Sequence, residues 1–301
     1  MSTLIHRNTK VLVQGMTGKE GQKAAESMLA SGVIVSAGVT PGKGGQQVLG
    51  KPIFNTVKEA LAFDPDINTS VLYVPPLAVL GAAQEAMQAG ISTLVIVTEN
   101  VPVKDSALMF EMSKKLGCTI LGPSSIGVLD TCLGKLGSIG NVTEGSMYTR
   151  GSVGVVSKSG GMCAETALAL SQAGLGQSSI IGIGGDTIAC SNMTDMLALL
   201  ENDPDTNAVV MLGEIGGFYE NQVADMVREK KFTKPLVAFI SGQFAEKTGR
   251  NVALGHAGAI ISTANSTARA KKRILRRAGV TVADYHHQIP DLIKNLLRNQ
   301  K

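Results

Sequence analysis

The chain has 301 residues, of which 44% are hydrophobic and 17% charged, and its formal net charge at pH 7 is +4. This composition is typical of a folded protein of two domains; it excludes an intrinsically disordered chain and gives no reason to expect nucleic-acid binding. No apolar run approaches the roughly 18 to 20 residues that span a bilayer, and the N-terminus has no signal-peptide pattern, so we expect a cytoplasmic protein without a membrane segment.

A strand, a glycine-rich turn and a helix open the chain. A short apolar run at residues 10–15 leads into a Gly-x-x-Gly-x-x-Gly turn, and residues 23–30 have helical periodicity. A helix N-terminus that follows such a turn can receive a phosphate. The spacing differs from the Gly-x-Gly-x-x-Gly of a nicotinamide fingerprint, and a Walker A loop is excluded because Lys19 is followed by Glu20.

The same alternation continues through the first half of the chain. Strands are predicted over residues 33–37, 70–76, 93–100 and 119–123, and helices over 78–90 and 104–116. Such alternation builds a parallel sheet with helices on both faces, and ligands gather at the carboxyl ends of its strands. Four loops are predicted to meet at that edge: Gly15–Glu20, Lys43, Val97–Glu99 and Ser124. The Lys43 loop alone fits a surface turn as well as a phosphate clamp.

A second α/β unit is predicted after a glycine-rich, irregular passage over residues 124–150. Its strands are expected at 154–157, 180–186, 208–213 and 235–240, and its helices at 158–173, 193–202, 221–230, 267–278 and the C-terminus. The first of these helices starts at an anion-ready turn that contains Ser159, Gly160 and Gly161. The basic run at 268–277 is interpreted as a solvated helix face, not a polyanion site.

His256 is the most informative single residue, because its nearest neighbours in Leu254-Gly-His-Ala-Gly-Ala-Ile-Ile are glycine and alanine, which are too small to pack around an imidazole. A neutral imidazole can be phosphorylated near neutral pH. A histidine that simply stabilises a turn is the alternative. Glu214 follows the strand 208–213, and a carboxylate beside an imidazole fixes the tautomer of the ring and raises its basicity. A capping or ion-paired acid is the alternative for Glu214.

The four cysteines, Cys118, Cys132, Cys163 and Cys190, are far apart in the sequence and form no Cys-x-x-Cys pair. They predict neither a disulfide framework nor a structural zinc site, and no metal site is expected in this chain. Cys163 lies in a Ser-Gly-Gly-Met-Cys turn, where we interpret it as a buried, inert thiol.

Six motifs together resemble the α subunit of succinate–CoA ligase (succinyl-CoA synthetase), in order and almost from end to end. They are Gly-Val-Thr-Pro-Gly-Lys-Gly-Gly (38–45), Phe-Asn-Thr-Val (54–57), Ser-Lys-Ser-Gly-Gly (157–161), Gly-Ile-Gly-Gly-Asp (182–186), Gly-Glu-Ile-Gly-Gly (213–217) and Gly-His-Ala-Gly-Ala-Ile-Ile (255–261). The resemblance implies an α/β protein with a Rossmann-like CoA-binding domain over 1–123, followed by a flavodoxin-like, doubly wound ligase domain over 124–301.

The resemblance also implies roles for particular residues. His256 would be phosphorylated during turnover, supported by Glu214, and Ser159, Gly160, Gly161 and Ala164 would line the phosphate and acid pocket. Coenzyme A would contact Thr17, Gly18, Lys19, Glu20, Lys43, Val97, Thr98, Glu99 and Ser124. ATP or GTP with Mg²⁺ would be bound mainly by a separate ATP-grasp β subunit, in an αβ or α2β2 assembly. The implied reaction is nucleoside-diphosphate-forming ligation of a carboxylic acid to CoA, as in the tricarboxylic acid cycle.

Departures from the family pattern concern the acid. Succinate-specific members carry a tyrosine where this chain has Ala164, which enlarges the acid pocket. The Ser-Gly-Gly-Met motif resembles the ATP-citrate lyase and citryl-CoA synthetase group, but Thr187 replaces the arginine of the lyase. Ser124 replaces an asparagine near the CoA site. Succinate is therefore the expected acid; a larger acid such as citrate or malate, and a non-catalytic CoA-binding regulatory module, are the alternatives.

Overall fold

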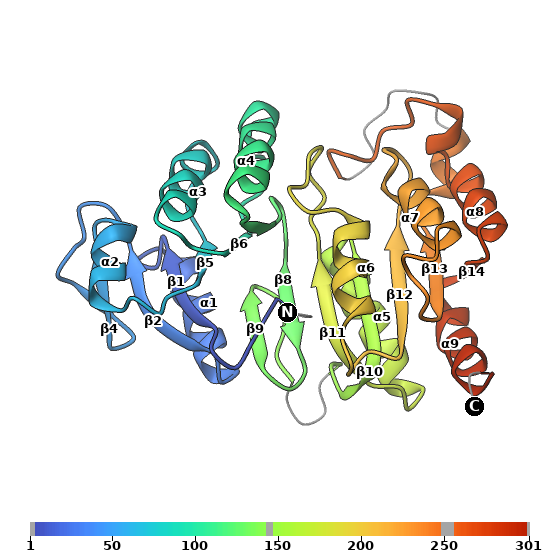
Figure 1. The fold of residues 1–301 in the computed structure, drawn as a ribbon, viewed down its shortest axis with the longest axis horizontal. Helices are drawn as coiled ribbons and strands as arrows, with labels where there is room; N and C mark the ends of the chain where they lie inside the picture. The colour runs from blue at the N-terminus through green and yellow to red at the C-terminus, as the bar shows by residue number, and fades with distance from the viewer. Residues whose placement is uncertain (1–3, 143–146, 248–255, 300–301) are drawn as a thin grey trace. The chain divides into compact units, whose positions relative to one another are not determined.

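The computed structural model describes residues 4–142, 147–247 and 256–299, which form two compact units. The N-terminal unit consists of residues 4–141 together with Ile188–Ser191, and the other described residues form the C-terminal unit. Both units are α/β folds built around a parallel sheet (Figure 1), as the alternation of apolar runs and helical periods predicts. The predicted domain division falls between residues 123 and 124, whereas the compact N-terminal unit continues to Asn141.

The sheet of the N-terminal unit has its first strand near the centre and is parallel except at one edge. In spatial order its strands are β3 (Gln47–Val48), β4 (Lys51–Phe54), β2 (Ile34–Val39), β1 (Lys10–Gln14), β5 (Thr69–Leu72), β6 (Thr93–Ile96) and β7 (Thr119–Leu121). Only the short β3 runs antiparallel to its neighbour. The helices of this unit are α1 (Lys19–Ala30), α2 (Val57–Phe63), the 3₁₀ turn η1 (Pro76–Ala78), α3 (Val79–Gln88) and α4 (Val103–Leu116).

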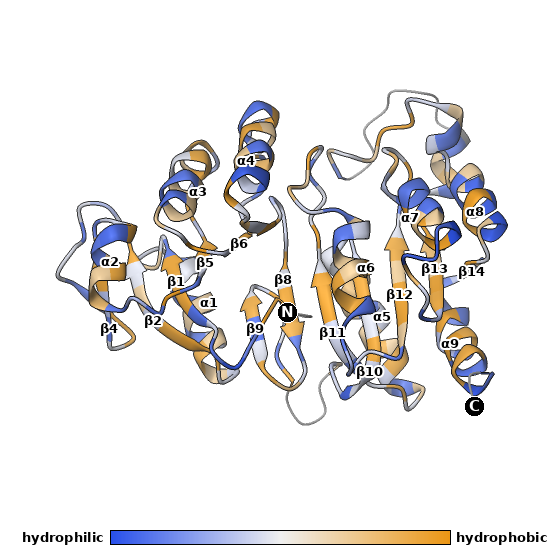
Figure 2. Ribbon diagram, in the orientation of Figure 1, coloured by the Kyte–Doolittle hydropathy of each residue, from blue (hydrophilic) through white to orange (hydrophobic). Residues whose placement is uncertain are grey.

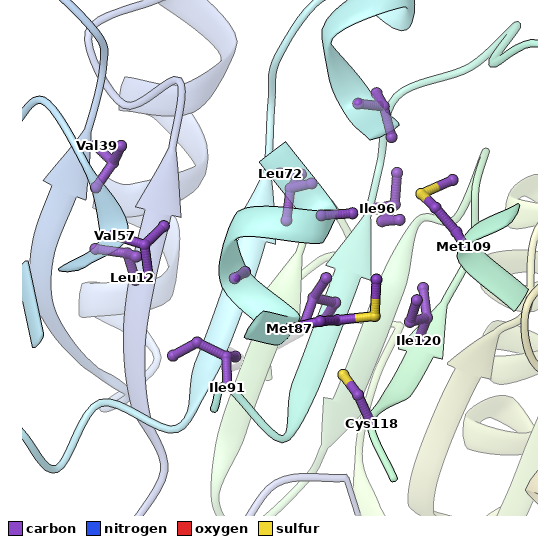
Figure 3. Close-up of a cluster of buried hydrophobic side chains, with 14 of the residues drawn as sticks. Leu12, Val39, Val57, Leu72, Met87, Ile91, Ile96, Met109, Cys118 and Ile120 are labelled. Atoms are coloured by element: carbon purple, nitrogen blue, oxygen red, sulfur yellow. The ribbon is translucent and has the colours of Figure 1, made fainter. Parts of the chain in front are cut away.

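The core of the N-terminal unit lies between this sheet and helices α2 to α4. Leu12 and Leu72 from the central strands pack in one buried cluster with Met87 of α3 and Met109 of α4 (Figure 3). The strands are hydrophobic along most of their length, while α4 alternates polar and apolar residues (Figure 2). This pattern is expected of a parallel sheet that helices cover, because its strands are buried on both faces.

In the C-terminal unit, five parallel strands follow the order β14 (Thr281–Ala283), β13 (Leu236–Ile240), β12 (Ala208–Gly213), β10 (Arg150–Ser157), β11 (Gln177–Gly182). The helices are α5 (Gly160–Gln172), α6 (Met193–Glu201), α7 (Tyr219–Arg228), α8 (Ala268–Arg277) and α9 (Ile289–Arg298), with 3₁₀ turns η2 (Gln243–Lys247), η3 (Ala264–Ser266) and η4 (His286–Gln288). Local signals fix several helix starts; for example, Asn192 and Asp195 form a capping box at α6.

The structure corrects the interpretation of residues 124–150 as an irregular passage. They contain an antiparallel hairpin, β8 (Gly127–Asp130) and β9 (Gly134–Gly137), which belongs to the N-terminal unit. The glycines at the ends of these strands made the strands hard to predict from the sequence. The hairpin needs a glycine at position 127, because Gly127 has a φ of +101° and a Cβ on it would lie 1.9 Å from the Leu136 carbonyl oxygen. The strands β3, β4 and β14 and the helix α2 were also absent from the sequence-based prediction, because they are short.

The basic run at 268–277 is not simply a solvated face. It forms α8, in which Lys271 is fully buried and Lys272 only 6% exposed. Arg269 and Arg276 of the same helix are exposed and pair with acidic residues at the surface. A basic residue can be buried when an acid accompanies it, and the acid that accompanies Lys271 comes from a distant part of the sequence.

Candidate active site in the C-terminal unit

Two neighbouring strands bring Lys158 and Glu214 to the same edge of the sheet. Strand β10 ends at Ser157 and β12 at Gly213, and the parallel register pairs Ser157 with Leu212. The residue after each strand therefore stands at the carboxyl edge, where ligands bind in open α/β sheets. Strand β11 ends in register with β10, at Gly182, so the Gly-Ile-Gly-Gly-Asp loop (182–186) begins at the same edge.

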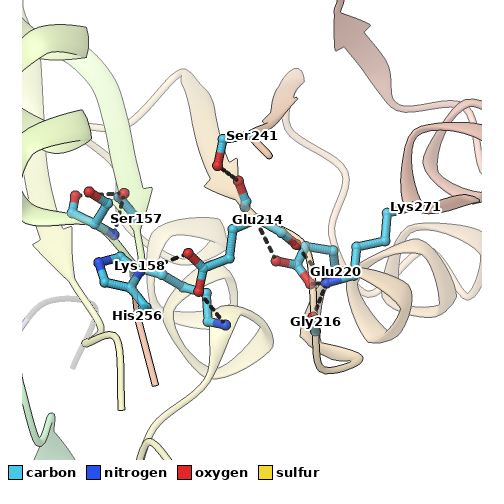
Figure 4. A network of polar contacts seen from close by, with 10 residues as sticks. Ser157, Lys158, Glu214, Gly216, Glu220, Ser241, His256 and Lys271 are labelled. Carbon is cyan, nitrogen blue, oxygen red and sulfur yellow. Dashed lines mark hydrogen bonds and ion pairs between the residues drawn. The ribbon is translucent and has the colours of Figure 1, made fainter. Parts of the chain in front are cut away.

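Glu214 lies between an imidazole and a buried ammonium (Figure 4). His256 Nδ1 is 2.7 Å from Glu214 Oε2, and Lys158 Nζ is 3.0 Å from Glu214 Oε1. The Lys158 side chain is 4% exposed and that of Glu214 is 11% exposed, whereas the His256 side chain is 32% exposed. The ammonium of Lys158 also lies 5.3 Å from the ring centre of Tyr219. The histidine is thus accessible, and the groups behind it are not.

Charge pairing keeps both buried groups ionised. Burial by itself raises the pKa of Glu214, but the hydrogen bond with His256 and the positive charge of Lys158 lower it, and the net pKa is below the usual value. Burial lowers the pKa of Lys158, but the charges of Glu220 and Glu214 raise it, and the net pKa is above the usual value. Each ionised group therefore stabilises the charge of the other.

An ionised Glu214 determines the tautomer of His256. A carboxylate can only accept hydrogen bonds, so the proton in the 2.7 Å contact belongs to Nδ1 of the imidazole. In a neutral imidazole the other nitrogen, Nε2, then carries the lone pair. The arrangement therefore makes Nε2 the nucleophilic atom, and the anion beside the ring increases its basicity.

The His256 turn fits between two glycine loops. The Gly258 N–H donates to the Gly185 carbonyl oxygen at 3.3 Å. A Cβ on Gly185 would lie 2.7 Å from Cδ2 of His256, and one on Gly216 would lie 2.4 Å from the Gly258 carbonyl oxygen. Gly216 also has a φ of +82°, which favours glycine. The glycines of the 182–186 and 213–217 motifs thus allow the backbone and ring of the histidine turn to approach closely.

Helix α5 begins three residues after Ser157, at the same edge. Ser159 is the N-cap residue and its hydroxyl accepts a hydrogen bond from Met162 N at 3.4 Å. The first N–H groups of a helix, here those of Gly160 and Gly161, have no acceptor within the helix and carry its positive dipole end. Ala164, one turn further, is partly buried. This helix start is suited to hold an anion.

A cavity of about 560 Å³ lies in the N-terminal unit, at the carboxyl ends of β1, β2 and β5. Its walls combine the glycine turn before α1 with the start of α3 and are lined among others by Gln14, Gly15, Thr17, Gly18, Thr40, Tyr73, Pro75 and Glu85. Its volume lies within the range of about 300 to 1,000 Å³ that is typical of small-molecule sites. Gly21 is needed behind this turn, because a Cβ there would lie 2.3 Å from the Gly15 carbonyl oxygen.

The residues expected to contact coenzyme A divide into two groups. Thr17 and Gly18 line the cavity, and the Thr17 hydroxyl lies 3.2 Å from that of Thr40. Thr98 donates to the carbonyl of Val74 in the cavity wall at 2.8 Å, and Ser124 N donates to the Thr98 carbonyl at 2.9 Å. Of the expected residues, only Thr17 and Gly18 line the cavity; Lys19, Glu20, Lys43 and Glu99 are exposed, and Val97 is half-buried.

Several residues of both sites were missed in the sequence. Lys158 directly follows a buried strand, and this position could have identified it as a site residue. The sequence-based prediction named only the residues that follow it, Ser159 to Gly161. Tyr73 and Pro75 similarly follow the strand β5. No pattern in the sequence points to Glu220 or Lys271, whose relation to Glu214 depends on the tertiary fold. Leu254 and Gly255, part of the histidine motif, lie outside the described residues.

The described residues were also expected to contain no reactive cysteine and no metal site. Cys163 is fully buried, and burial raises the pKa of its thiol to about 12. Within residues 4–142, 147–247 and 256–299, no group of three His, Cys, Asp or Glu side chains is arranged to hold a metal ion. No helix in these ranges is long and apolar enough to cross a membrane.

Comparison with known families gives two matches that divide the chain in the same order as the two units. Residues 6–100 match the CoA binding domain family, and residues 156–282 match the CoA-ligase family. The chain is 40% identical to the succinate–CoA ligase [ADP-forming] subunit α of Methanothermobacter thermautotrophicus, over 97% of this chain and 96% of the relative. It is also 40% identical to the malate–CoA ligase subunit α of Methylorubrum extorquens, over 94% of both chains.

Other relatives have different acids in their names. The chain is 38% identical to an ADP-forming sulfoacetate-CoA ligase subunit of an Acholeplasma species, over 98% of both chains. Among solved structures, it resembles ATP citrate lyase of Methanosaeta concilii in complex with (3S)-citryl-CoA, with a TM-score of 0.91 and 28% identity. The likeness covers all of this chain and 51% of the lyase chain.

Proposed function

Since this chain belongs to the family of succinate–CoA ligase α subunits, we propose that it forms acyl-CoA through a phosphorylated His256 and an acyl phosphate. The observation that carries this proposal is the buried Lys158–Glu214 pair behind the accessible ring of His256. A histidine that only stabilised a turn would not need a contact with an ionised carboxylate that is itself paired with a buried ammonium. The N-terminal unit binds coenzyme A, and the C-terminal unit carries the phosphoryl chemistry.

In the first step, His256 Nε2 attacks the terminal phosphorus of a nucleoside triphosphate. The Nε2–P bond forms, the bond from that phosphorus to the bridging oxygen breaks, and nucleoside diphosphate leaves. Glu214 keeps the proton on Nδ1 and stabilises the positive charge that develops on the ring. The N–H groups at the start of α5 are suited to the negative oxygens of the phosphoryl group.

In the second and third steps, the phosphoryl group becomes a leaving group. A substrate carboxylate oxygen attacks phosphorus, the Nε2–P bond breaks, and an acyl phosphate forms. The CoA thiolate then attacks the acyl carbon, the C–S bond forms, the C–O bond to phosphate breaks, and inorganic phosphate leaves. His256 regains its lone pair, so the chain is ready for another cycle.

The proposed site for coenzyme A is the cavity of the N-terminal unit. The start of α1, directly after the Gly15–Gly18 turn, offers backbone N–H groups to a phosphate, and the apolar part of the wall suits a nucleobase. Thr17 and Gly18 are the proposed direct contacts. The further proposed CoA residues, which do not line the cavity itself, are Lys19, Glu20, Lys43, Val97, Thr98, Glu99 and Ser124. Lys43 would supply a positive charge for the phosphates.

The nucleotide requires a partner subunit. We propose an ATP-grasp β subunit that binds ATP or GTP with Mg²⁺ and presents its terminal phosphate to His256. The relatives' names as α subunits support such a partner.

For the acid we propose succinate, on the strength of the full-length similarity to succinate–CoA ligase α subunits. Ala164 in the proposed acid pocket leaves room for a larger acid, and relatives that act on malate and sulfoacetate support that second candidate. Both candidates share a carboxylate that accepts the phosphoryl group. A panel of succinate, malate, citrate and sulfoacetate, assayed for CoA thioester with the β subunit present, separates them.

Labelling with [γ-³²P]ATP tests the phosphohistidine. The complex with its β subunit is expected to take up base-stable, acid-labile label on this chain, and His256→Ala is expected to take up none while still binding CoA. Absence of label on the wild-type complex would contradict the mechanism and favour a non-catalytic CoA-binding module.

A further inference from the structure

A second ion pair lies behind the first. Lys271 of α8 and Glu220 of α7 form a salt bridge in which both side chains are 0% exposed. The two residues are 51 positions apart in the sequence. A buried ion pair contributes little net stability on its own, because desolvation of both charges offsets their attraction. Its presence here therefore calls for a role other than strengthening the core.

The pair holds the peptide backbone of Glu214 from two sides. Glu220 Oε1 accepts a hydrogen bond from Glu214 N at 3.1 Å. Lys271 Nζ donates to the Glu214 carbonyl oxygen at 2.8 Å and also to the carbonyl of Gly216. Figure 4 shows the arrangement, with the Glu214 carboxylate directed to His256 and its backbone to Lys271 and Glu220.

The surrounding structure makes room for this pair. A Cβ on Gly213 would lie 2.6 Å from both Cγ and Oε1 of Glu220, so only glycine leaves the carboxylate of Glu220 in contact with the backbone. Gly213, which precedes Glu214 in the Gly-Glu-Ile-Gly-Gly motif, thus leaves the space that the Glu220 side chain occupies. Four charges, two lysines and two glutamates, then balance within the C-terminal unit.

We propose that Lys271 and Glu220 are positioning residues that fix the Glu214 peptide so that its carboxylate meets Nδ1 of His256. Neither touches the reacting atoms; both contact the peptide backbone of Glu214, and the charge of Glu220 also raises the pKa of Lys158. The inference rests on the proposed function of His256. It predicts that the geometry of the His256–Glu214 contact, and with it the rate of phosphorylation, depends on two residues that no catalytic motif contains.

The adjacent lysine on α8 provides a matched control. Lys272 is also buried, but its Nζ lies 5.9 Å from the Phe239 ring centre and 3.7 Å from Asp284 at the surface, and no contact with Glu214 is seen among the described residues. Lys271→Met and Lys272→Met each remove one buried ammonium from the same helix. Only the first removes the support of Glu214.

Removal of one member of a buried pair leaves the other charge without a partner and can prevent folding. The double variant Glu220→Gln/Lys271→Met removes both charges and is expected to fold, since Gln keeps an acceptor for Glu214 N. The wild type, both single lysine variants and the double variant are compared as complexes with the β subunit. The readouts are thermal unfolding, CoA affinity, the single-turnover rate of ³²P labelling and the ¹⁵N shifts of the His256 ring.

The expected result is a fall in labelling rate of about 10- to 100-fold in the folded double variant, as is common when a group that orients a functional residue is lost. CoA affinity is expected to stay within about twofold, and the ¹⁵N shifts are expected to show a mixture of tautomers instead of Nδ1–H alone. Lys272→Met should label within about twofold of the wild-type rate, since it leaves the support of Glu214 intact.

Labelling at the wild-type rate in the folded double variant, with an unchanged tautomer, would overturn the inference and leave the pair a structural role. Absence of label in the wild-type complex would instead overturn the proposed function. The tautomer readout needs no nucleotide, so it separates the two failures.

Discussion

Gly185 lies against the face of the His256 ring so closely that a single added carbon would displace it. An ideal Cβ on Gly185 would be 2.7 Å from Cδ2, 2.8 Å from Cγ and 3.2 Å from Nδ1 of the imidazole. The same residue accepts a hydrogen bond from Gly258 N through its carbonyl. The missing side chain of Gly185 therefore allows the His256 ring to lie close to the 182–186 loop, and its carbonyl oxygen holds the backbone of the histidine turn at Gly258.

Replacement of Gly185 with alanine is expected to lower the rate of His256 phosphorylation by roughly 100-fold, because a misplacement of about 1 Å at a reacting group costs on that order. The measurement is single-turnover labelling with [γ-³²P]ATP in the complex. CoA binding to the N-terminal unit of the same variant serves as the control, and it should be unchanged. A labelling rate within threefold of the wild type would show that the ring has room to move.

Replacement of Lys158 with methionine removes the counter-ion of Glu214 while keeping a side chain of similar length. We expect the pKa of the Glu214 carboxyl to rise, because the burial that opposes ionisation remains and the positive charge is lost. The acid limb of the pH–rate profile for His256 labelling should then move to higher pH. Lys158→Arg keeps the charge, so its acid limb should stay near that of the wild type. A common profile for all three proteins would argue against a role of Lys158 through Glu214.

Glu214→Gln tests the same pair through stability. The folded-state pKa of Glu214 lies below its usual value of 4.5, so its ionised form stabilises the fold above that pH, and this contribution is lost as the pH falls through the folded-state pKa. At pH 7 the variant removes the carboxylate that pairs with the buried ammonium of Lys158, which costs about 3 kcal/mol. Urea unfolding should show this difference at pH 7, and the difference should shrink as the pH falls below 4.5.

Lys135 of β9 allows a prediction that is independent of the active site. It is 3% exposed, it donates to the Ile139 carbonyl, and burial lowers its pKa from 10.5 to about 8. The unfolded chain therefore binds more protons between pH 8 and 10.5, so the stability of the N-terminal unit should rise with pH across that window. A gain of about 1 to 3 kcal/mol between pH 8 and 10 is expected in denaturant unfolding. Lys135→Met should lack this rise.

Ala164→Tyr tests the acid pocket. An aromatic side chain at this position would reduce the space at the start of α5, so kcat/KM for malate or citrate should fall more than that for succinate. A change in the ratio of roughly tenfold or more is expected, since a steric or hydrogen-bonding change in a pocket discriminates acids at about that level. An unchanged ratio across the acid panel would place acid selection elsewhere in the complex.

The sequence by itself determined the α/β class and most of the long strands and helices, and it predicted His256 and Glu214 as the residues that carry the chemistry of the proposed site. It could do so because apolar runs, helical periods and glycine turns are local patterns. Glu214 directly follows an apolar run, and His256 lies in a segment rich in glycine and alanine. The family resemblance rested on the same local motifs, and the full-length relatives confirm the family.

Only the tertiary structure decided what lies behind those motifs. The parallel register of β10 and β12 places Lys158 beside Glu214, and the packing of α7 on α8 brings Glu220 to Lys271. Sequence patterns report whether a residue suits water or a core, so the basic run of α8 predicted a solvated face. They do not report which distant residue neutralises a buried charge. The salt bridge with Glu220 is what allows Lys271 to be fully buried in the C-terminal unit.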